Sequence, residues 1–391
     1  MTGSRGLAKL IMLTALATNR GTASAADWTE TFDASANAAY VTNPQLLPGS
    51  NIADQSGQVM LDGATHAQTE RAQLTVTPRF SVIRYAHETD LDFETGSVDV
   101  AFLRKLERGQ WTLDGQALVD STVVSELGTT GITSINRRHY AESISTGYQY
   151  DLTERLSWQL QGMWQDTRYT DALRFGLTDY GYVSAQSGLG WSFSERIQGS
   201  FTLETDRIDP KVGVTQNEYS ASVQLKRSFS ERYAWRASIG GARVQAGPAG
   251  SQTSSLFELG ASRQGERVQW DLSVKRAVLP IGNGLLARED LASFGATVGI
   301  SERSSVNLSL NVIRTEPVTV SVYLAPGISL AYQVYSGAAW GQASAQWLYH
   351  LSRHWALAAT YQRARARNYL FAEWANGDQA RIGVVWQSAP Q

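Results

Sequence analysis

The chain has 391 residues and a net charge of −2 at pH 7, with 34 basic residues against 36 acidic ones and 42% apolar residues. This balance offers no basic footprint for nucleic acid, so no nucleic-acid partner is expected. No run of 18 apolar residues occurs, which excludes a transmembrane helix. Because no linker or change of texture divides the sequence after residue 30, one large domain is the simpler interpretation.

The first 25 residues differ from everything that follows. Arg5 and Lys9 precede a short apolar run over residues 10–18, and small residues then lead to Ala25. This arrangement is typical of a secretory signal that is removed before the mature domain begins at residue 26. Cysteine is absent from the whole chain, so an exported domain of residues 26–391 must rely on hydrogen bonding and packing instead of disulfides.

Short polar triplets recur along the chain, with central residues 35 to 51 positions apart. Each is preceded by an aromatic or aliphatic stretch, so we interpret the triplets as tight turns between strands. They are TER (69–71), LER (106–108), TER (153–155), SER (194–196), SER (230–232), GER (265–267), SER (301–303) and the variant SRH (352–354).

Apolar and polar residues alternate between these triplets, as in IQGSFTLE (197–204) and SVNLSLNV (305–312). A period of two indicates β-strands. The stretches fill the roughly 9–11 residues that a tilted strand needs to cross a bilayer, whereas strands of a soluble sandwich average about five or six. In LSWQLQGMWQD (156–166) we expect one face toward lipid and the other toward a wet lumen. The lipid face is Leu156, Trp158, Leu160 and Trp164, and the lumen face is Ser157, Gln159, Gln161 and Gln165.

Longer irregular segments, such as 206–217, 246–253 and 278–290, separate the strands at the end opposite the triplets. Short turns at one end and long loops at the other are typical of an outer-membrane barrel. Eight turns with both termini at the same end predict an all-β, antiparallel, up-and-down transmembrane barrel of about 18 strands, with 16 as the alternative. The count of 18 requires residues 27–41 and 56–68 to form the first pair.

Aromatic residues are abundant, with 12 Trp and 16 Tyr, and suit girdles at the two membrane interfaces. Tyr148, Tyr150 and Trp191 are candidates because each stands just before a turn. The final stretch, ARIGVVWQSAPQ, alternates as a closing strand and partly matches the terminal signal by which the barrel-assembly machinery recognises its clients. We therefore expect outer-membrane lipid and that machinery as partners.

Several stretches carry a family resemblance: TPRFSVIRY (77–85), DSTVVSELGTTGITSINRRH (120–139), YQYDLTERLSW (148–158) and LTDYGYVSAQSGLGWSFSER (177–196). On these residues the sequence resembles an uncharacterised family of outer-membrane β-barrel proteins of Gram-negative bacteria, some associated with exopolysaccharide production or export. The resemblance implies a location in the outer membrane and a part in the passage of polysaccharide or small hydrophilic solutes. It supplies no catalytic, cofactor-binding or metal-binding residue.

The sequence contains no metal-spaced histidine cluster, P-loop or GxSxG motif, so neither a cofactor nor an enzymatic activity is expected. The nearest approach to a hydrolase site is His139 beside Ser134 and Glu142. An arginine pair directly before His139 disfavours a neutral general base there.

Inward positions are rich in Gln, Ser, Thr and Asn, with scattered charges that either form a transverse field in a channel or fill it with salt bridges. The candidate lumen or loop residues are Arg79, Arg84, Asp120, Glu126, Arg137, Arg138 and Glu204. The segment 315–337 either constricts the lumen or extends strands beyond the membrane. Three functions stay open: a porin-like channel or exopolysaccharide-associated transport component, a structural or assembly barrel with a plugged lumen, and an outer-membrane hydrolase.

Overall fold

A computed structural model describes residues 26–127, 130, 136–171, 173–247, 250–318, 337–368 and 373–388. The predicted signal over residues 1–25 and most of the segment 315–337 lie outside these residues. Among the described residues, no helix has the length and apolar character needed to cross a bilayer.

Eighteen strands dominate the described chain, with one short α-helix, α2 (Thr122–Ser125), and two 3-10 turns, η1 (Thr89–Leu91) and η2 (Leu173–Phe175). The strands are β1 (Asp27–Thr42), β2 (Ala53–Gln68), β3 (Ala72–Tyr85), β4 (Phe93–Leu106), β5 (Gly109–Ser121), β6 (Arg138–Asp151), β7 (Leu156–Tyr169), β8 (Tyr180–Ser194), β9 (Ile197–Pro210), β10 (Gln216–Ser228), β11 (Tyr233–Gln245), β12 (Ser251–Gln264), β13 (Val268–Ile281), β14 (Leu285–Ser301), β15 (Ser304–Pro317), β16 (Ala338–His350), β17 (Trp355–Asn368) and β18 (Ala375–Gln387).

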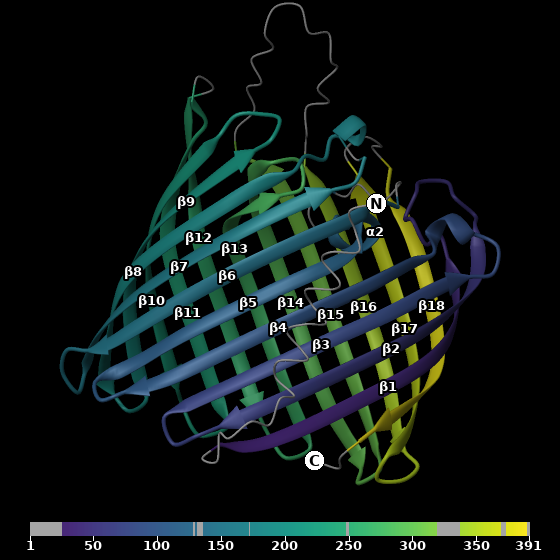
Figure 1. Cartoon of the computed structure of the whole chain (residues 1–391), viewed down its shortest axis with the longest axis horizontal. Coiled ribbons are helices and arrows are strands. Elements are labelled where there is room, and N and C mark those ends of the chain that lie inside the picture. The colour runs from purple at the N-terminus through teal and green to yellow at the C-terminus, as the bar shows by residue number, and fades with distance from the viewer. Residues whose placement is uncertain are drawn as a thin grey trace, which may run out of the picture.

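Each strand pairs antiparallel with the next one along the chain, and β18 returns to pair with β1, which closes the sheet. Figure 1 shows the resulting wall of tilted strands, with purple β1 beside yellow β18. The prediction of 18 strands is confirmed, and so is the first pair, since β1 and β2 are in register along their whole length. Each of the eighteen described strands thus has a partner on both sides, which is the arrangement that lets a sheet cross a membrane.

The predicted tight turns are confirmed, and the Ser or Thr that opens most of them has a structural role. The Thr153 hydroxyl accepts hydrogen bonds from the backbone N–H groups of Arg155 and Leu156, at 3.2 and 3.0 Å. The Ser194, Ser230 and Ser301 hydroxyls accept from the N–H two residues further on, at 3.2 to 3.3 Å. Such local side-chain bonds satisfy backbone donors that a two- to four-residue connection leaves without a strand partner.

The barrel is apolar outside and polar inside. In β7, Leu160 and Trp164 are 45% and 44% exposed on the outer face, as predicted. Directly paired residues share a face of the sheet, so the strand register assigns the outer face from strand to strand around the barrel. That face carries large exposed apolar side chains such as Ile239, Leu259 and Leu310.

Aromatic pairs gather on the outer face at the short-turn end. Tyr148 stacks with Tyr150 at 6.4 Å between ring centroids, and Trp191 contacts Phe193 at 5.9 Å. Further pairs at this end are Phe32–Trp386, Phe102–Trp111, Tyr148–Trp158 and Trp347–Tyr349. Rings at this level suit the boundary between lipid and water.

Candidate functional site in the barrel mouth and lumen

The connection between β5 and β6 is anchored at the long-loop end of the barrel by Glu126. Helix α2 opens this connection, and the Ser121 hydroxyl caps it by accepting from the Val123 N–H at 3.2 Å. Directly after α2, the Glu126 carboxylate accepts hydrogen bonds from the Tyr169 hydroxyl at 2.6 Å and the Thr130 hydroxyl at 2.7 Å. Glu126 is only 2% exposed, so these bonds replace the water that its charge has lost.

The same connection reaches two separated parts of the barrel wall. A Cβ atom added to Gly282, between β13 and β14, would lie 2.5 Å from both carboxylate oxygens of Glu126. Leu127, the residue after Glu126, packs against an apolar cluster formed by Leu46 and alanines of β17 and β18. β13 and β14 lie on one side of β5 in the sheet order and β17 and β18 on the other. The connection therefore crosses the mouth of the barrel and narrows it.

The β13–β14 hairpin also leans into the mouth. Its Gly282 carbonyl accepts a hydrogen bond from the Thr178 N–H of the β7–β8 loop at 3.0 Å. The Leu286 N–H donates to the Gln216 side chain of β10 at 2.7 Å. Leu286 also joins an apolar cluster with Tyr182 and Ile208, which come from the inner faces of β8 and β9. Strands far apart in the sheet order are thus tied together across the lumen.

A buried imidazole–carboxylate pair lies below this connection. His139 Nδ1 and Asp120 Oδ1 are 2.7 Å apart, and both residues are buried. The His139 ring stacks on Tyr169, with 4.9 Å between ring centroids. Asp120, His139, Tyr169 and Glu126 therefore form one contiguous polar chain from the wall to the β5–β6 connection.

The residues proposed around His139 for a hydrolase are not brought together by the described part of the chain. Glu142 is three positions along β6 from His139 and faces outward, in phase with exposed Ile144. Ser134 lies outside the described residues. His139 packs on Tyr169, and its contacts are those of a group that holds the mouth together.

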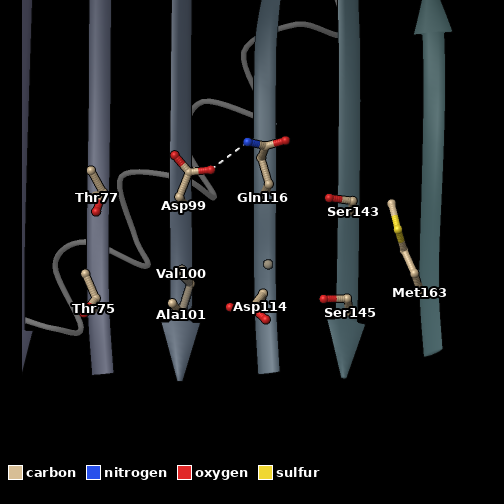
Figure 2. Close-up of a pocket in the computed structure, with 11 residues that line it drawn as sticks. Thr75, Thr77, Asp99, Val100, Ala101, Asp114, Gln116, Ser143, Ser145 and Met163 are labelled. Atoms are coloured by element: carbon tan, nitrogen blue, oxygen red, sulfur yellow. Dashed lines mark hydrogen bonds between the residues drawn. The ribbon is translucent and has the colours of Figure 1, made fainter. Parts of the chain in front are cut away.

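A polar depression of about 300 Å³ lies on the inner wall across β3 to β7. Figure 2 shows its side chains projecting from neighbouring strands, with the Gln116 amide donating to Asp99 at 2.7 Å. Its lining includes the carboxylates of Asp99 and Asp114 and the hydroxyls of Ser143 and Ser145. This part of the lumen offers oxygen acceptors and hydroxyl groups to a solute.

A second group of carboxylates lies on the inner faces of β9 and β10. Glu204 accepts from the Ser184 hydroxyl at 3.2 Å, and Asp206 accepts from the Tyr182 hydroxyl at 2.9 Å. Glu218, which is paired in register with Asp206, is also buried. Lys275 is an electrostatic neighbour of Glu204.

The candidate residues lie in three places: the lumen, the mouth of the barrel and the outer face. Arg79 and Glu204 lie in the lumen, where Arg79 is 3.2 Å from Asp99. Asp120, Glu126 and Arg137 lie at the mouth, where the Arg137 guanidinium donates to the Asn136 carbonyl at 3.1 Å.

Arg84 and Arg138, which were predicted to lie in the lumen or the loops, are at the long-loop end of their strands. Both face outward and lie at 2.6 and 3.8 Å from Glu94. Arg84 is five positions from Arg79 along β3, which places the two side chains on opposite faces of the strand. In the described part of the chain, Arg79, Arg84, Arg137 and Arg138 therefore do not share one wall of the lumen.

No protein-family model matches the sequence, and no curated protein matches it. Solved structures that align with most of the chain include OccK2 (OpdF) of Pseudomonas aeruginosa in complex with glucuronate, at TM-score 0.46 and 9% identity over 93% of this chain and 99% of that one. OccAB1 of Acinetobacter baumannii aligns at TM-score 0.45 and 10% identity over 92% and 96% of the two chains. The copper transporter OprC aligns at TM-score 0.42 and 12% identity over 92% and 80%. At these identities and TM-scores the similarity is remote, and the fold is established by the pairing of the strands.

Sequence reasoning did not single out Tyr169, Asp99, Asp114 or Glu218. Asp99 and Asp114 follow the alternation of β4 and β5 and could have been assigned to the lumen from it. Tyr169 ends β7 and gave no signal, because its partner Glu126 is 43 residues away and belongs to an irregular connection.

Proposed function

We propose that the protein is an outer-membrane channel for small hydrophilic solutes, with a preference for cations. The observation that carries this proposal is the acid-rich inner wall of a closed barrel of 18 strands. Barrels of 16 to 18 strands are wide enough to hold an aqueous channel. The apolar outer face and the aromatic pairs at the short-turn end support placement in a membrane.

Acidic side chains outnumber basic ones at the inward positions of the described strands. A lumen with such an excess concentrates cations and repels anions, as rings of Asp and Glu do in cation channels. The inward acids between the rims are Asp33, Asp62, Asp99, Asp114, Glu204, Asp206, Glu218, Glu258, Asp271 and Glu289, and the inward bases there are Arg79, Arg236, Lys275 and Arg381.

The narrowed mouth adds a size limit to this charge preference. The β5–β6 connection touches both the β13–β14 hairpin and the cluster that contains Leu46. A solute entering from the long-loop end must pass beside it. We therefore propose that the mouth selects by size and the wall below it by charge.

Planar-bilayer recording tests this proposal. Under a KCl gradient, the reversal potential of the wild-type protein should report a greater permeability for K⁺ than for Cl⁻. Glu204→Gln combined with Glu218→Gln should move the reversal potential toward zero, because two inner-wall charges are lost. Glu142→Gln, on the outer face of β6, is the matched control and should leave it unchanged. A barrel that carries no steady current, or that prefers anions, would overturn the proposal and favour a plugged structural barrel.

The hydroxyl and amide groups of the wall favour a second candidate, the passage of a neutral polysaccharide strand, which the family resemblance implies. Gln116, Ser143 and Ser145 face the depression shown in Figure 2 and can hydrogen-bond sugar hydroxyls. A neutral oligosaccharide added to the bath should then block the ion current in a concentration-dependent way. If the current is unaffected at millimolar oligosaccharide, the polysaccharide candidate is excluded and the small-solute channel stays.

A further inference from the structure

Arginine is concentrated on the outer face of the barrel at the long-loop end. The register places these side chains in phase with exposed apolar residues, such as Leu310 and Val312 on β15, and away from the lumen. The outward arginines in this half of the described strands are Arg84, Arg138, Arg168, Arg207, Arg243, Arg276, Arg288, Arg314, Arg363, Arg365 and Arg367. The lysines of the described strands lie elsewhere, since Lys105, Lys226 and Lys275 face inward.

The two ends of the outer face therefore differ in chemistry. The short-turn end carries the aromatic pairs, and its arginines lie largely in the turns, as Arg196, Arg232 and Arg303 do. At the long-loop end the arginines lie within the strands. Charged side chains near lipid are costly unless they reach the interface or an opposite charge.

The arginines are most closely spaced around β16. Ala339 on β16 is paired in register with Arg314 of β15 on one side and with Arg367 of β17 on the other. Gly341, two positions along β16, is likewise flanked by Val312 and Arg365. Neighbouring strands are about 4.8 Å apart, so the two arginine-bearing strands flank this strip at a separation of about 10 Å.

The outer face of β16 between them consists of small residues. Ala339, Gly341, Ala343 and Ala345 follow one another along it, and Trp347 ends the strip toward the short turns. Alanine and glycine are shorter than the flanking Leu310 and Tyr361, so the strip is lower than its neighbours and amounts to a shallow apolar groove, with the basic side chains at its long-loop end. We name the groove of Arg314, Arg365, Arg367 and the β16 strip the β16 groove.

The arginines of the β16 groove are oriented by contacts that leave them accessible. Arg314 forms an ion pair with Glu316, and its side chain is still 59% exposed. The Arg365 guanidinium lies 4.4 Å from the centroid of the Trp374 ring, and that of Arg367 lies 6.0 Å from it. Stacking on an aromatic face fixes the guanidinium plane and leaves its N–H donors able to bind an anion.

We propose that the β16 groove binds a phosphorylated, multiply acylated glycolipid in the leaflet at the long-loop end of the barrel. Its phosphate lies between Arg314 and the Arg365–Arg367 pair, because guanidinium groups donate paired hydrogen bonds to phosphate oxygens. One of its acyl chains lies along the floor of the groove, where Gly341 and Ala343 leave room for it. Like the proposed function, this proposal requires the barrel to lie in a membrane, but it does not require the barrel to conduct ions.

The experiment measures lipid binding to the purified, detergent-solubilised full-length barrel by native mass spectrometry. The probes are diphosphorylated hexa-acyl lipid A, the same lipid after removal of its phosphates, and phosphatidylglycerol. The triple variant R314Q/R365Q/R367Q removes the basic walls, and R196Q/R232Q/R303Q removes three turn arginines from the other end as the matched control. Gly341→Trp fills the floor while it keeps every charge. A Cβ there meets its nearest atoms at 3.8 Å, so the substitution does not force the backbone to move.

The wild-type protein should bind diphosphorylated lipid A at least about tenfold more tightly than the dephosphorylated lipid, because charge-assisted bonds to phosphate carry the affinity. The R314Q/R365Q/R367Q variant should lose that preference, and the turn-arginine control should keep it. Gly341→Trp should weaken the binding of both forms of lipid A.

Three outcomes would overturn the inference: equal binding of the two forms of lipid A, equal loss in the triple variant and its control, or a preference for phosphatidylglycerol. Retained heat-modifiable migration on gels verifies that each variant is folded. Ion current that persists while lipid A binding is lost separates this inference from the channel proposal.

Discussion

Removal of the Glu126 carboxylate should release the β5–β6 connection and widen the mouth of the barrel. The carboxylate accepts the Tyr169 and Thr130 hydroxyls at 2.6 and 2.7 Å. Hydrogen bonds to a charged group contribute about 1.5–3 kcal/mol each, so Glu126→Ala should shift the equilibrium between docked and released connection by about 3 kcal/mol or more, roughly a hundredfold. Tyr169→Phe removes one of the two bonds and should shift it by about tenfold.

Single-channel recording in planar bilayers measures this shift as a higher mean conductance and a larger share of time in the most open level. The Glu126→Ala and Tyr169→Phe changes should also be non-additive, with a coupling energy of about 1–2 kcal/mol in a double-mutant cycle. Glu142→Gln, an exposed carboxylate on the outer face of the same β6 strand, is the control and should behave as wild type. A Glu126→Ala channel with the wild-type conductance pattern would refute the argument that this connection narrows the mouth.

Two further predictions concern the stability of the barrel. Ile239, at the middle of β11 and 73% exposed, lies on the outer face of the barrel, which the proposed function places in lipid. Ile239→Lys should therefore destabilise refolded barrels in lipid vesicles by about 2–4 kcal/mol, and Ser238→Lys, facing the lumen, by less than about 1 kcal/mol. Equal urea midpoints for these two variants would contradict the assignment of faces. Gly109 opens β5 with φ +134°, and an added Cβ would lie 2.0 Å from the Gln149 carbonyl oxygen. Gly109→Ala should lower the yield of heat-modifiable folded protein, whereas Gly57→Ala, where a Cβ meets nothing within 4 Å, should not.

The strands could be predicted from the sequence because their information is local. Alternation, the spacing of the polar triplets and the position of the long segments each depend on a few neighbouring residues, and together they gave the strand number and the closing order. Even the weakly periodic β1 was correctly paired with β2. The outward position of Arg84 could also have been predicted from the alternation, since Arg84 is in phase with Phe80 and Val82 on β3.

The organisation of the mouth could not be predicted, because its contacts join residues far apart in the sequence. Glu126 meets Tyr169 and approaches Gly282 through an irregular connection, and no periodicity constrains where such a segment goes. By contrast, His139 and Asp120 are paired directly in register on the adjacent strands β5 and β6, so their contact follows from the strand register and not from the irregular connection. The position of an irregular segment depends on the arrangement of the strands that flank it and on the distant residues it contacts. Neither can be predicted from a short stretch of sequence.

The pairing of the first strand with the last has a consequence for biosynthesis. β1 is synthesised long before its partner β18. In the closed barrel, the Phe32 N–H of β1 also donates to the hydroxyl of Ser388, the residue after β18, at 2.6 Å. Until β18 has been synthesised, one edge of β1 and one edge of the most recently made strand expose unpaired N–H and C=O groups, with which a strand of another protein can pair. Truncation of the final dozen residues removes most of the β18 residues that pair with β1, so the barrel should then stay open along that seam.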